Sequence, residues 1–335
     1  MRSHHSSCAI TWPRRFAVAC GATMLACAGF GCTQLATRPD VTIGTVSPTG
    51  TDYPLGASIC RLFNLDAPRH HMRCAEEPSS GYVANIEALR SGKIDIGIVL
   101  SDVLADAAAG RAPFASRGPA TDLRILFAGH DEMLTVVARR ELNLRAIASL
   151  RGKRIDIGNA KSRQRSNIES VMAAFGLTRG VFADVRELPP IERYRAFCGN
   201  EIDAIVYSVS HPNGLIQDVT RTCNGVLVEI AGPEIDRMLS EHQEYERAAI
   251  PGGIYANNPT DVRTFGVRAA VVTTSNMAAI TAYEITKAVF ENFDAFRRLH
   301  PTFGTLRIAD MIQRDGRVPM HPGALRYYRE RGWMS

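Results

Sequence analysis

Short polar side chains that could bind a small molecule lie in several loops of the sequence, each at the end of an apolar run. In the stretch VTIGTVSPTGTDYPLGASICRLF (residues 41–63), an alternating apolar run enters a loop of Thr, Ser, Pro and Gly, and apolar residues then resume at helical spacing. Hydroxyl, amide and phenol groups in such loops bind a solute through hydrogen bonds. We expect contacts with a ligand from Ser47, Thr49, Thr51, Tyr53, Ser80, Gly81, Asn85, Ser162, Gln164 and Ser208.

A cluster of basic residues could supply the charge that a carboxylate needs. The segment KSRQR (161–165) stands at the start of an expected helix, where the helix dipole and a guanidinium attract the same anion. Lys161 fits a solvated loop, whereas Arg165 is expected to contact the ligand or the hinge. This segment could therefore hold the carboxylate of a small solute.

Ser, Asp and His at strand ends raise the question of catalysis. Ser101 and Asp102 follow an apolar strand, and His211 lies in the turn SVSHPNG. The chain has no GxSxG elbow, and a Ser-Asp pair at a strand end more often caps a helix than attacks a substrate. We therefore expect no enzyme. Ser101, Asp102 and His211 are expected to contact the ligand, with helix capping for the Ser-Asp pair and a turn or capping role for His211 as the alternatives. The loops also lack GxGxxG and GxxxxGK[ST], so no nucleotide cofactor is expected.

The elements that must position these residues form a pattern that occurs twice. A strand, a small-residue loop and a helix open the chain, and LRGKRIDIG, a polar loop and NIESVMAAFG (167–176) repeat that order. In addition, ALRSGKIDIGIVLS (88–101) aligns with AFCGNEIDAIVYSV (196–209), each a helix end, a Gly turn, Ile-Asp and an apolar strand. Apolar strands buried on both faces are typical of parallel sheets covered by helices. The sequence therefore predicts two similar α/β lobes.

Two extended runs could connect such lobes. LTVVARR (134–140) and FGVRAAVVTT (265–274) are placed to cross between them. The predicted division has a first lobe of residues 41–133 and 268–335, a second lobe of residues 140–262, and a hinge of residues 134–139 and 263–267. Since ligands of open α/β sheets bind beyond the carboxyl ends of the strands, the loops 45–53, 78–85, 101–102, 159–166 and 208–213 should converge on a cleft.

The amino terminus has the layout of a secretory signal. Two arginines precede the apolar run FAVACGATMLACAGF (16–30), and small residues close it, so we expect residues 1–31 to be a signal peptide and the mature protein to be periplasmic. A membrane anchor that is not removed is the alternative. The segment AGFGC resembles a lipoprotein processing site but lacks the usual Leu, which leaves lipidation of Cys32 open. Without its first 31 residues the chain loses three arginines, and its formal charge falls from +5 to +2, which does not suggest a nucleic-acid partner.

Beyond Cys32 the chain has four cysteines, an even number, and they lie in two regions. In an oxidising compartment, pairing by proximity predicts the disulfides Cys60–Cys74 and Cys198–Cys223. A zinc site is the rival interpretation, but no CxxC pair or flanking His supports it, and no metal is expected.

The chain resembles the solute receptors of TRAP transporters, specifically the TAXI branch, over essentially the whole mature length. The matching segments are TIGT, TGTDYPLGASICRL, CAEEPSSGYVANIEALRSGKIDIGIVLSD, LRGKRIDIG, GNEIDAIVYSVSHPNGLIQDVTRTC, IPGGIY, TFGVRA, TKAVFENFDAF and MHPGALRYYRE. The resemblance implies a type II periplasmic binding protein fold, with two α/β lobes joined by a two-strand hinge. It also implies a small carboxylate-bearing solute, such as glutamate, glutamine or a dicarboxylate, and delivery to the TRAP membrane subunits.

Four departures from the family pattern lie in the expected cleft loops. Asp52-Tyr53 stands where relatives often have Tyr-Tyr, Ser80-Gly81-Tyr82 replaces Gly-Gly-Ser, Leu100 replaces Gln, and the turn at 161–165 gains Arg163. An unpaired polar group in a closed cleft costs about 1–3 kcal/mol, so these changes should shift the choice of ligand. Two other functions remain as alternatives: a ligand sensor for a membrane signalling protein and an exported hydrolase.

Overall fold

Ten strands form the backbone of the fold and share one sheet. The computed structural model describes residues 39–48, 50–160, 162–242, 244–313 and 316–335. Along the sheet the order is β2-β1-β3-β10-β4-β7-β5-β6, with β8 on β4 and β9 on β10. The strands are β1 (Val41–Thr45), β2 (Cys74–Pro78), β3 (Ile96–Leu100), β4 (Leu123–Arg139), β5 (Arg154–Asp156), β6 (Asp184–Arg186), β7 (Ala204–Val209), β8 (Gly225–Val228), β9 (Glu246–Ile250) and β10 (Val262–Thr274).

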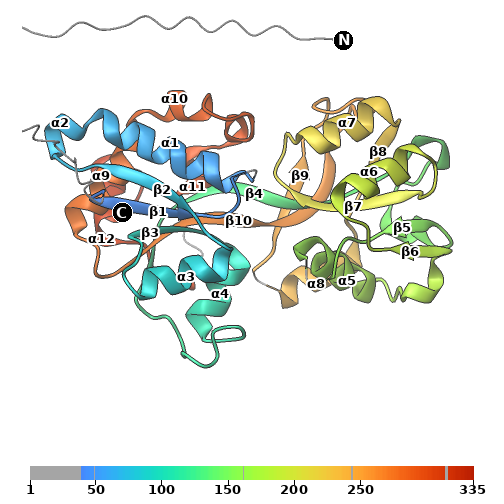
Figure 1. Ribbon diagram of the computed structural model, residues 1–335, viewed down its shortest axis with the longest axis horizontal. Coiled ribbons are helices and arrows are strands. Elements are labelled where there is room, and N and C mark those ends of the chain that lie inside the picture. Colours follow the sequence, from blue (N-terminus) through green and yellow to red (C-terminus); the bar gives the residue numbers. More distant parts are fainter. Residues whose placement is uncertain (1–38, 49, 161, 243, 314–315) are drawn as a thin grey trace, which may run out of the picture. The chain divides into compact units, whose positions relative to one another are not determined.

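Helices cover both faces of this sheet (Figure 1). They are α1 (Asp52–Leu65), α2 (Ala67–His70), α3 (Tyr82–Arg90), α4 (Ser101–Ala109), α5 (Arg163–Ala174), α6 (Pro190–Cys198), α7 (Gly214–Thr222), α8 (Pro233–Glu241), α9 (Ala279–Glu291), α10 (Phe293–Arg297), α11 (Ile308–Met311) and α12 (Pro322–Glu330). Short 3₁₀ turns occur at Arg140–Leu142, Ile147–Leu150, Arg179–Val181 and Pro301–Thr305.

The repeat seen in the sequence is also a repeat in hydrogen bonding. Asp95 and Asp203 occupy matching positions just before β3 and β7. The Asp95 carboxylate accepts from the Thr42 N–H of β1 at 2.9 Å, and the Asp203 carboxylate accepts from the Arg154 N–H of β5 at 2.9 Å. The orders β2-β1-β3 and β6-β5-β7 are therefore two copies of one parallel unit, which confirms the expected α/β fold of two similar lobes.

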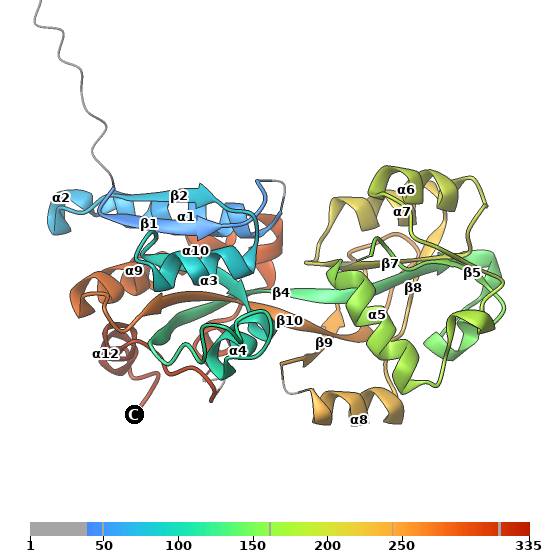
Figure 2. The same cartoon turned by 60° about the horizontal axis from the view of Figure 1, so that its bottom comes forward.

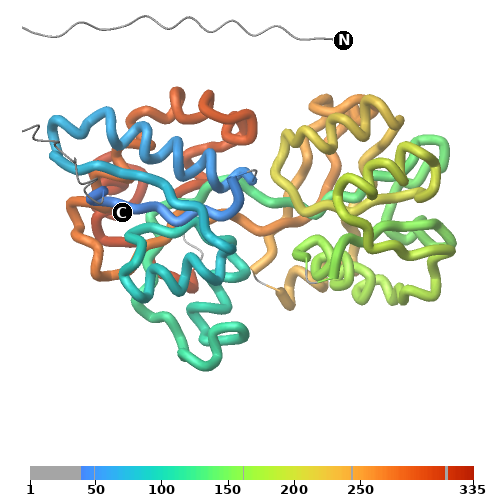
Figure 3. The backbone as a smooth tube through the Cα atoms, in the orientation of Figure 1, coloured from blue at the N-terminus to red at the C-terminus, as the bar shows by residue number. Residues whose placement is uncertain are grey.

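Strands β4 and β10 are long enough to belong to both lobes (Figure 3). Residues 123–133 of β4 pair with β10, and residues 133–139 pair with β7 and β8. The change of partner falls at Met133, which is opposite Gly266 of β10 and Val209 of β7. This change of partner strand supports the two-strand hinge. The lobe boundaries given above stay a prediction.

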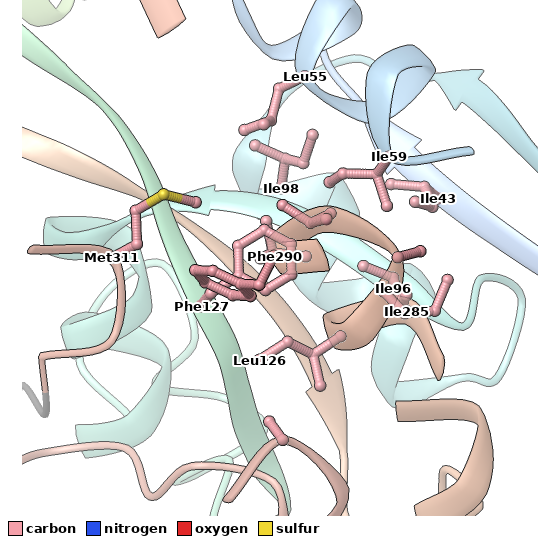
Figure 4. Packing of buried hydrophobic residues seen from close by; sticks show 14 of the residues in the cluster. Ile43, Leu55, Ile59, Ile96, Ile98, Leu126, Phe127, Ile285, Phe290 and Met311 are labelled. Atoms are coloured by element: carbon pink, nitrogen blue, oxygen red, sulfur yellow. The ribbon is translucent and has the colours of Figure 1, made fainter. Parts of the chain in front are cut away.

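Each lobe has apolar cores on both faces of its sheet, because alternate strand residues point to opposite sides. In β3, Ile96, Ile98 and Leu100 pack with α1, α9 and α12, and Figure 4 shows part of this cluster around Phe127 and Phe290. Val99 points the other way, into the cluster under α3 and α4. In the second lobe one core lies under α5 and α8 and another under α6 and α7.

Several expected elements are present with shifted ends. The near-continuous apolar run from Ile94 to Leu100 predicts a strand, and β3 begins at Ile96 within it. The apolar residues at helical spacing over 283–296 predict one helix, which is divided between α9 and α10 at Asn292. The segment 163–166, expected as part of a polar loop, is instead the first turn of α5, because the Ser162 hydroxyl caps the helix by accepting from the Arg165 N–H.

Both predicted disulfides are present and confirm the pairing by proximity. Cys60 of α1 is bonded to Cys74 of β2, and Cys198 at the end of α6 is bonded to Cys223 after α7. The signal segment 1–31 and Cys32 lie outside the described residues. Within the described residues, no helix combines the length and apolar character that crossing a bilayer requires. The same residues hold no group of His, Cys, Asp and Glu arranged for a metal ion.

Candidate functional site

A pocket is lined by residues of α4 in the first lobe and α5 in the second. Figure 2 shows these two helices on either side of the crossing strands β4 and β10. The volume of the pocket is about 640 Å³. The pocket is lined by Asp102, Val103, Pro113, Ser162, Arg163, Arg165, Ser166, Asn167, Glu169 and Tyr245. Walls from two lobes that share a hinge are the arrangement expected of a solute-binding cleft.

Arg163, the first residue of α5, forms the link between this pocket and the first lobe. Its guanidinium makes an ion pair with Asp102 and lies 3.5 Å from the carboxylate of Glu132 on β4. The guanidinium carbon also lies over the Tyr82 ring, 5.4 Å from its centre. Burial alone would lower the Arg163 pKa, but the Asp102 and Glu132 carboxylates outweigh it and raise the pKa, so the guanidinium stays charged.

Behind the Tyr82 ring lies a second carboxylate. The Tyr82 hydroxyl donates to Oδ2 of Asp52 at 2.7 Å, and His130 Nε2 lies 3.4 Å from Asp52 Oδ1. Asp52 and His130 are both buried, at 5% and 4% exposure. Burial, with added repulsion from Asp52 and Glu132, raises the Tyr82 pKa far above its usual value, so the phenol remains a hydrogen-bond donor.

Glu132 is the residue of the site whose ionisation is most sensitive to its surroundings. Burial raises its pKa to about 7, against the opposing effect of Arg163. Its Oε2 atom has no hydrogen-bond partner. A carboxylate whose pKa is near neutrality gains or loses a proton in response to any charge that enters the pocket.

The start of α5 is held in place by a buried ion pair of the second lobe. Arg193 and Asp156, at 2% and 0% side-chain exposure, pair beneath the helix. With its amide oxygen turned toward Arg193, Gln164 accepts from both terminal nitrogens at 2.7 Å. Gly158 makes room for this, because a Cβ at Gly158 would lie 2.2 Å from the end of the Gln164 amide group. Gln164 therefore positions the helix that presents Arg163.

Other contacts near the pocket join the two lobes or extend its polar wall. The Ser101 hydroxyl donates to the carbonyl of Glu244 at 3.1 Å and accepts from the Arg268 N–H. In the second lobe, Tyr245 donates to the side-chain oxygen of Asn167, which in turn donates to the Ser208 hydroxyl, both at 3.1 Å.

The residues predicted from the sequence are divided between the pocket and its surroundings. Asp102, Ser162 and Arg165 line the pocket, and Ser208 contacts Asn167 in its wall. The Arg165 guanidinium is paired with Glu169 and Glu187 of its own lobe, and the Ser162 hydroxyl also donates to the carbonyl of Asn159.

The predicted residues of the opening loops lie outside the pocket lining. Ser47 and Ser80 are exposed, Thr51 precedes α1 and Gly81 precedes α3, while Thr49 lies outside the described residues. The Tyr53 hydroxyl donates to Glu76 of β2 at 3.2 Å. Asn85 is fully buried, and its amide nitrogen donates to the carbonyls of Gly44, Thr45 and Ile98, which ties β1 to β3. Contact with a ligand stays a prediction for these residues.

The His211 ring is buried and hydrogen-bonded to other side chains of the protein. Its ring bonds the Thr135 hydroxyl at 2.9 Å and the Tyr255 hydroxyl at 2.6 Å, and burial lowers its pKa to about 4. The neutral imidazole also lines a separate cavity of about 50 Å³ that includes Arg268.

Six side chains of the candidate site were not among the predicted contact residues: Asp52, Tyr82, Glu132, Arg163, Asn167 and Tyr245. Three of them, Asp52, Tyr82 and Arg163, were noted as departures from the family pattern. These departures could have identified the residues from the sequence, because a change of residue type inside a cleft loop indicates a change in the groups that the cleft contacts.

A larger cavity of about 810 Å³ lies in the second lobe between the segments 140–145, 226–227 and 253–262. It includes no residue of the first lobe, so closure of the hinge would not act on it. Its buried amide, Asn258, is already bonded to the Leu227 N–H and the Ala256 carbonyl. The pocket between the lobes is therefore the candidate site.

The fold and the cleft define a class of protein, and known structures agree with it. The TctC solute binding protein from Polaromonas has a TM-score of 0.51 at 12% identity, covering 79% of this chain and 88% of that one. PhnD1 from Prochlorococcus marinus, in complex with methylphosphonate, has a TM-score of 0.48 at 12% identity, covering 88% and 98%. The periplasmic aliphatic sulphonate binding protein SsuA from Escherichia coli has a TM-score of 0.41 at 14% identity, covering 80% and 79%. The chain has the α/β fold of the periplasmic solute-binding proteins, in the two-lobe type II form.

The sequence also identifies the family. Residues 43–332 match the model of the NMT1-like family, and the chain belongs to that family. This is a family of binding proteins, which confirms the expectation of a binding protein rather than an enzyme. The match does not resolve the TAXI branch.

Proposed function

We propose that this protein is the extracytoplasmic solute receptor of a TRAP transporter of the TAXI type. It binds a small carboxylate-bearing solute between its lobes and delivers the solute to the membrane subunits. The observation that supports this most directly is the pocket whose walls come from α4 and α5, on two lobes joined by the continuous strands β4 and β10. A solute that contacts both walls stabilises the closed form by its differential affinity.

The carboxylate of the solute is proposed to bind at the first turn of α5. Arg163 lines the pocket there, and its guanidinium can donate two parallel hydrogen bonds to a carboxylate. The dipole at the start of this 12-residue helix favours the same charge. Asn167 and Tyr245 supply neutral polar groups in the same wall.

An oxidising compartment is part of the proposal. Disulfides persist in exported proteins and are rare in reducing compartments, and each lobe contains one. Removal of residues 1–31 completes the proposal, with the periplasm as location and docking to the permease as the contact with the membrane. Lipidation of Cys32 is left open.

A thermal-unfolding panel tests the binding function. The protein without residues 1–31 is mixed at millimolar concentration with amino acids and dicarboxylates, and a compound that binds the native state alone raises the unfolding temperature. At 100 times the dissociation constant the gain in unfolding free energy is about 2.7 kcal/mol. No shift with any compound would count against the proposal.

Uptake tests the transport role. Vesicles that contain the TRAP membrane subunits should accumulate the identified solute only when this protein is added. Binding without dependent uptake would instead favour the sensor function.

A further inference from the structure

The first-lobe side chains around Arg163 carry more negative than positive charge. Asp52, Asp102 and Glu132 bring three carboxyl groups to the cluster around Tyr82, and the second lobe contributes the guanidinium of Arg163. Among the described residues, His130 is the other basic group that contacts this cluster, through Asp52. The first-lobe side chains of this cluster therefore carry an excess of negative charge, which a positive group balances.

The groups around the Arg163 guanidinium are those that recognise a cation. An aromatic face attracts a cation through its ring quadrupole, and the Tyr82 ring lies 5.4 Å from the guanidinium carbon. Carboxylates on either side, Asp102 in direct ion pairing and Glu132 at 3.5 Å, complete the surroundings. All three residues belong to the first lobe, and the cation that they surround comes from the second.

Two oxygens of this cluster have no hydrogen-bond donor although they are buried: Asp52 Oδ1 and Glu132 Oε2. The nearest basic nitrogens, His130 Nε2 and Arg163 Nε, lie 3.4 and 3.5 Å away, beyond the usual length of a charge-assisted hydrogen bond. Buried oxygens of this kind are acceptors for a donor that the described residues do not supply.

The ion pairs of Arg163 set a condition on any solute that uses it. If a carboxylate draws the guanidinium away from Asp102 and Glu132, these buried groups lose their counter-ion, and removal of one partner of a buried ion pair is strongly unfavourable. A solute that also carries a positive nitrogen avoids this, because that nitrogen takes the place of the guanidinium.

We propose that Tyr82, Asp102 and Glu132, backed by Asp52, form a subsite for a cationic nitrogen of the solute, which the guanidinium of Arg163 fills in this structure. Binding is an exchange: the solute nitrogen enters the subsite, and Arg163 turns to the solute carboxylate. The inference rests on the proposed function and narrows it, because it selects solutes that carry both charges, such as amino acids, over dicarboxylates.

A chemical-rescue experiment tests the subsite without knowledge of the solute. The Arg163→Ala variant removes the internal guanidinium, and methylguanidinium at low millimolar concentration should raise its unfolding temperature in a saturable manner. The wild type, whose subsite is filled, should show no such rise. Arg247→Ala is the matched control, since it removes a guanidinium from an exposed pair with Asp236 on the surface of the second lobe.

The double variant Arg163→Ala/Glu132→Gln separates the subsite from a general salt effect. It should lose the saturable response, because one carboxylate of the subsite is gone. An equal response in Arg163→Ala, the wild type and Arg247→Ala would overturn the proposal.

A second measurement uses the unmodified protein and matched probes. L-glutamate and glutarate differ only in the amino group, and calorimetry should give glutamate an affinity about 100-fold higher. Equal affinities would overturn the inference and leave the proposed function standing. Binding of putrescine, with no binding of either acid, would support the subsite and overturn the carboxylate part of the proposed function.

Discussion

At the scale of single residues, Glu132 couples the charge of the site to pH. Its folded-state pKa is about 7, above the ordinary value of 4.5, because burial disfavours the carboxylate. Between those values the folded state holds a proton that the unfolded state has released. Its contribution to the free energy of unfolding therefore decreases as pH rises through this window, by about 1.4 kcal/mol per pH unit at most.

The Glu132→Gln variant tests this sign. Urea unfolding at pH 5, 6, 7 and 8 should show that the variant gains stability relative to the wild type as pH rises from 5 to 7, with no further change above pH 7. Because other groups titrate equally in both proteins, the difference between the two curves isolates Glu132. A difference that is constant with pH would contradict the assigned pKa.

Gly158 is the residue that allows Gln164 to reach Arg193. An alanine there would be strained twice, by a backbone φ of +84° and by a Cβ that lies 2.2 Å from the end of the Gln164 amide group. Gly152→Ala is the matched control, since its φ is +72° and its added Cβ meets nothing within 4 Å.

We expect Gly152→Ala to lose about 1 kcal/mol of unfolding free energy, the usual penalty of the left-handed region for a residue with a Cβ. Gly158→Ala should lose clearly more and should also weaken solute binding, since Gln164 is displaced. Chemical denaturation and the solute assay measure both effects. Equal losses in the two variants would mean that the Gln164 contact carries no energy.

Several predicted residues lie one position from a residue of the cluster around Arg163. Tyr53 follows Asp52, Gly81 precedes Tyr82, and Ser162 and Gln164 flank Arg163. Each predicted residue lies at the first turn of a helix, where one step along the chain rotates a side chain by about 100°. A loop can therefore be predicted to reach a cleft while the side chain that enters the cleft is not.

At the scale of elements, the two disulfides close different kinds of loop. Cys60–Cys74 spans 14 positions and joins α1 to β2 inside the first core, where the two cysteines are 3% and 6% exposed. Cys198–Cys223 spans 25 positions and joins the ends of α6 and α7, with both cysteines half-buried. Loop entropy alone gives each about 3 kcal/mol, slightly more for the longer loop.

Two double-alanine variants separate the contribution of loop entropy to stability from the contribution of packing around the sulfur atoms. We expect Cys60→Ala/Cys74→Ala to be less stable than Cys198→Ala/Cys223→Ala, because deletion of buried sulfur atoms adds a cavity penalty to the lost cross-link. Urea midpoints compared at equal slope give the order. The reverse order would mean that loop length governs both cross-links.

The N-cap rule could have predicted the start of α5, but the expected helix segment began later in the chain, at Asn167. Ser162 is a favourable N-cap residue, and its hydroxyl accepts from the Arg165 N–H at 3.3 Å. The polar residues that follow favoured a loop, yet they occupy the first helical turn. Their exposed face contacts the pocket, and this is why a polar first turn is tolerated.

At the scale of the whole molecule, β4 and β10 approach each other closely at the position where β4 changes its partner strand, which is the expected hinge. A Cβ at Gly266 would lie 2.3 Å from the carbonyl oxygen of Glu132, a backbone atom that cannot move without shifting its strand. Gly266→Ala should therefore change the relation between the lobes as well as the stability. Gly214→Ala is the control, since its Cβ meets nothing within 4 Å.

Small-angle scattering and solute titration test this expectation. Gly266→Ala should alter the scattering profile and weaken solute binding, whereas Gly214→Ala should match the wild type in both. A Gly266→Ala variant that binds the solute normally would show that the strands can separate at this point without affecting closure.

The sequence by itself determined the features that depend on local pattern. Duplicated segments predicted two α/β lobes, near-continuous apolar strands predicted a covered sheet, and the spacing of four cysteines predicted both disulfides. Only the tertiary structure decided which side chains meet around Arg163. Asp52, Tyr82, Asp102 and Arg163 lie in the first turns of four helices and Glu132 lies within β4, so their contact depends on where the helices begin and on how β4 and β10 join the lobes. The physical reason is that periodicity reports which face of an element is buried, whereas a binding site depends on the direction of individual side chains at the ends of several elements.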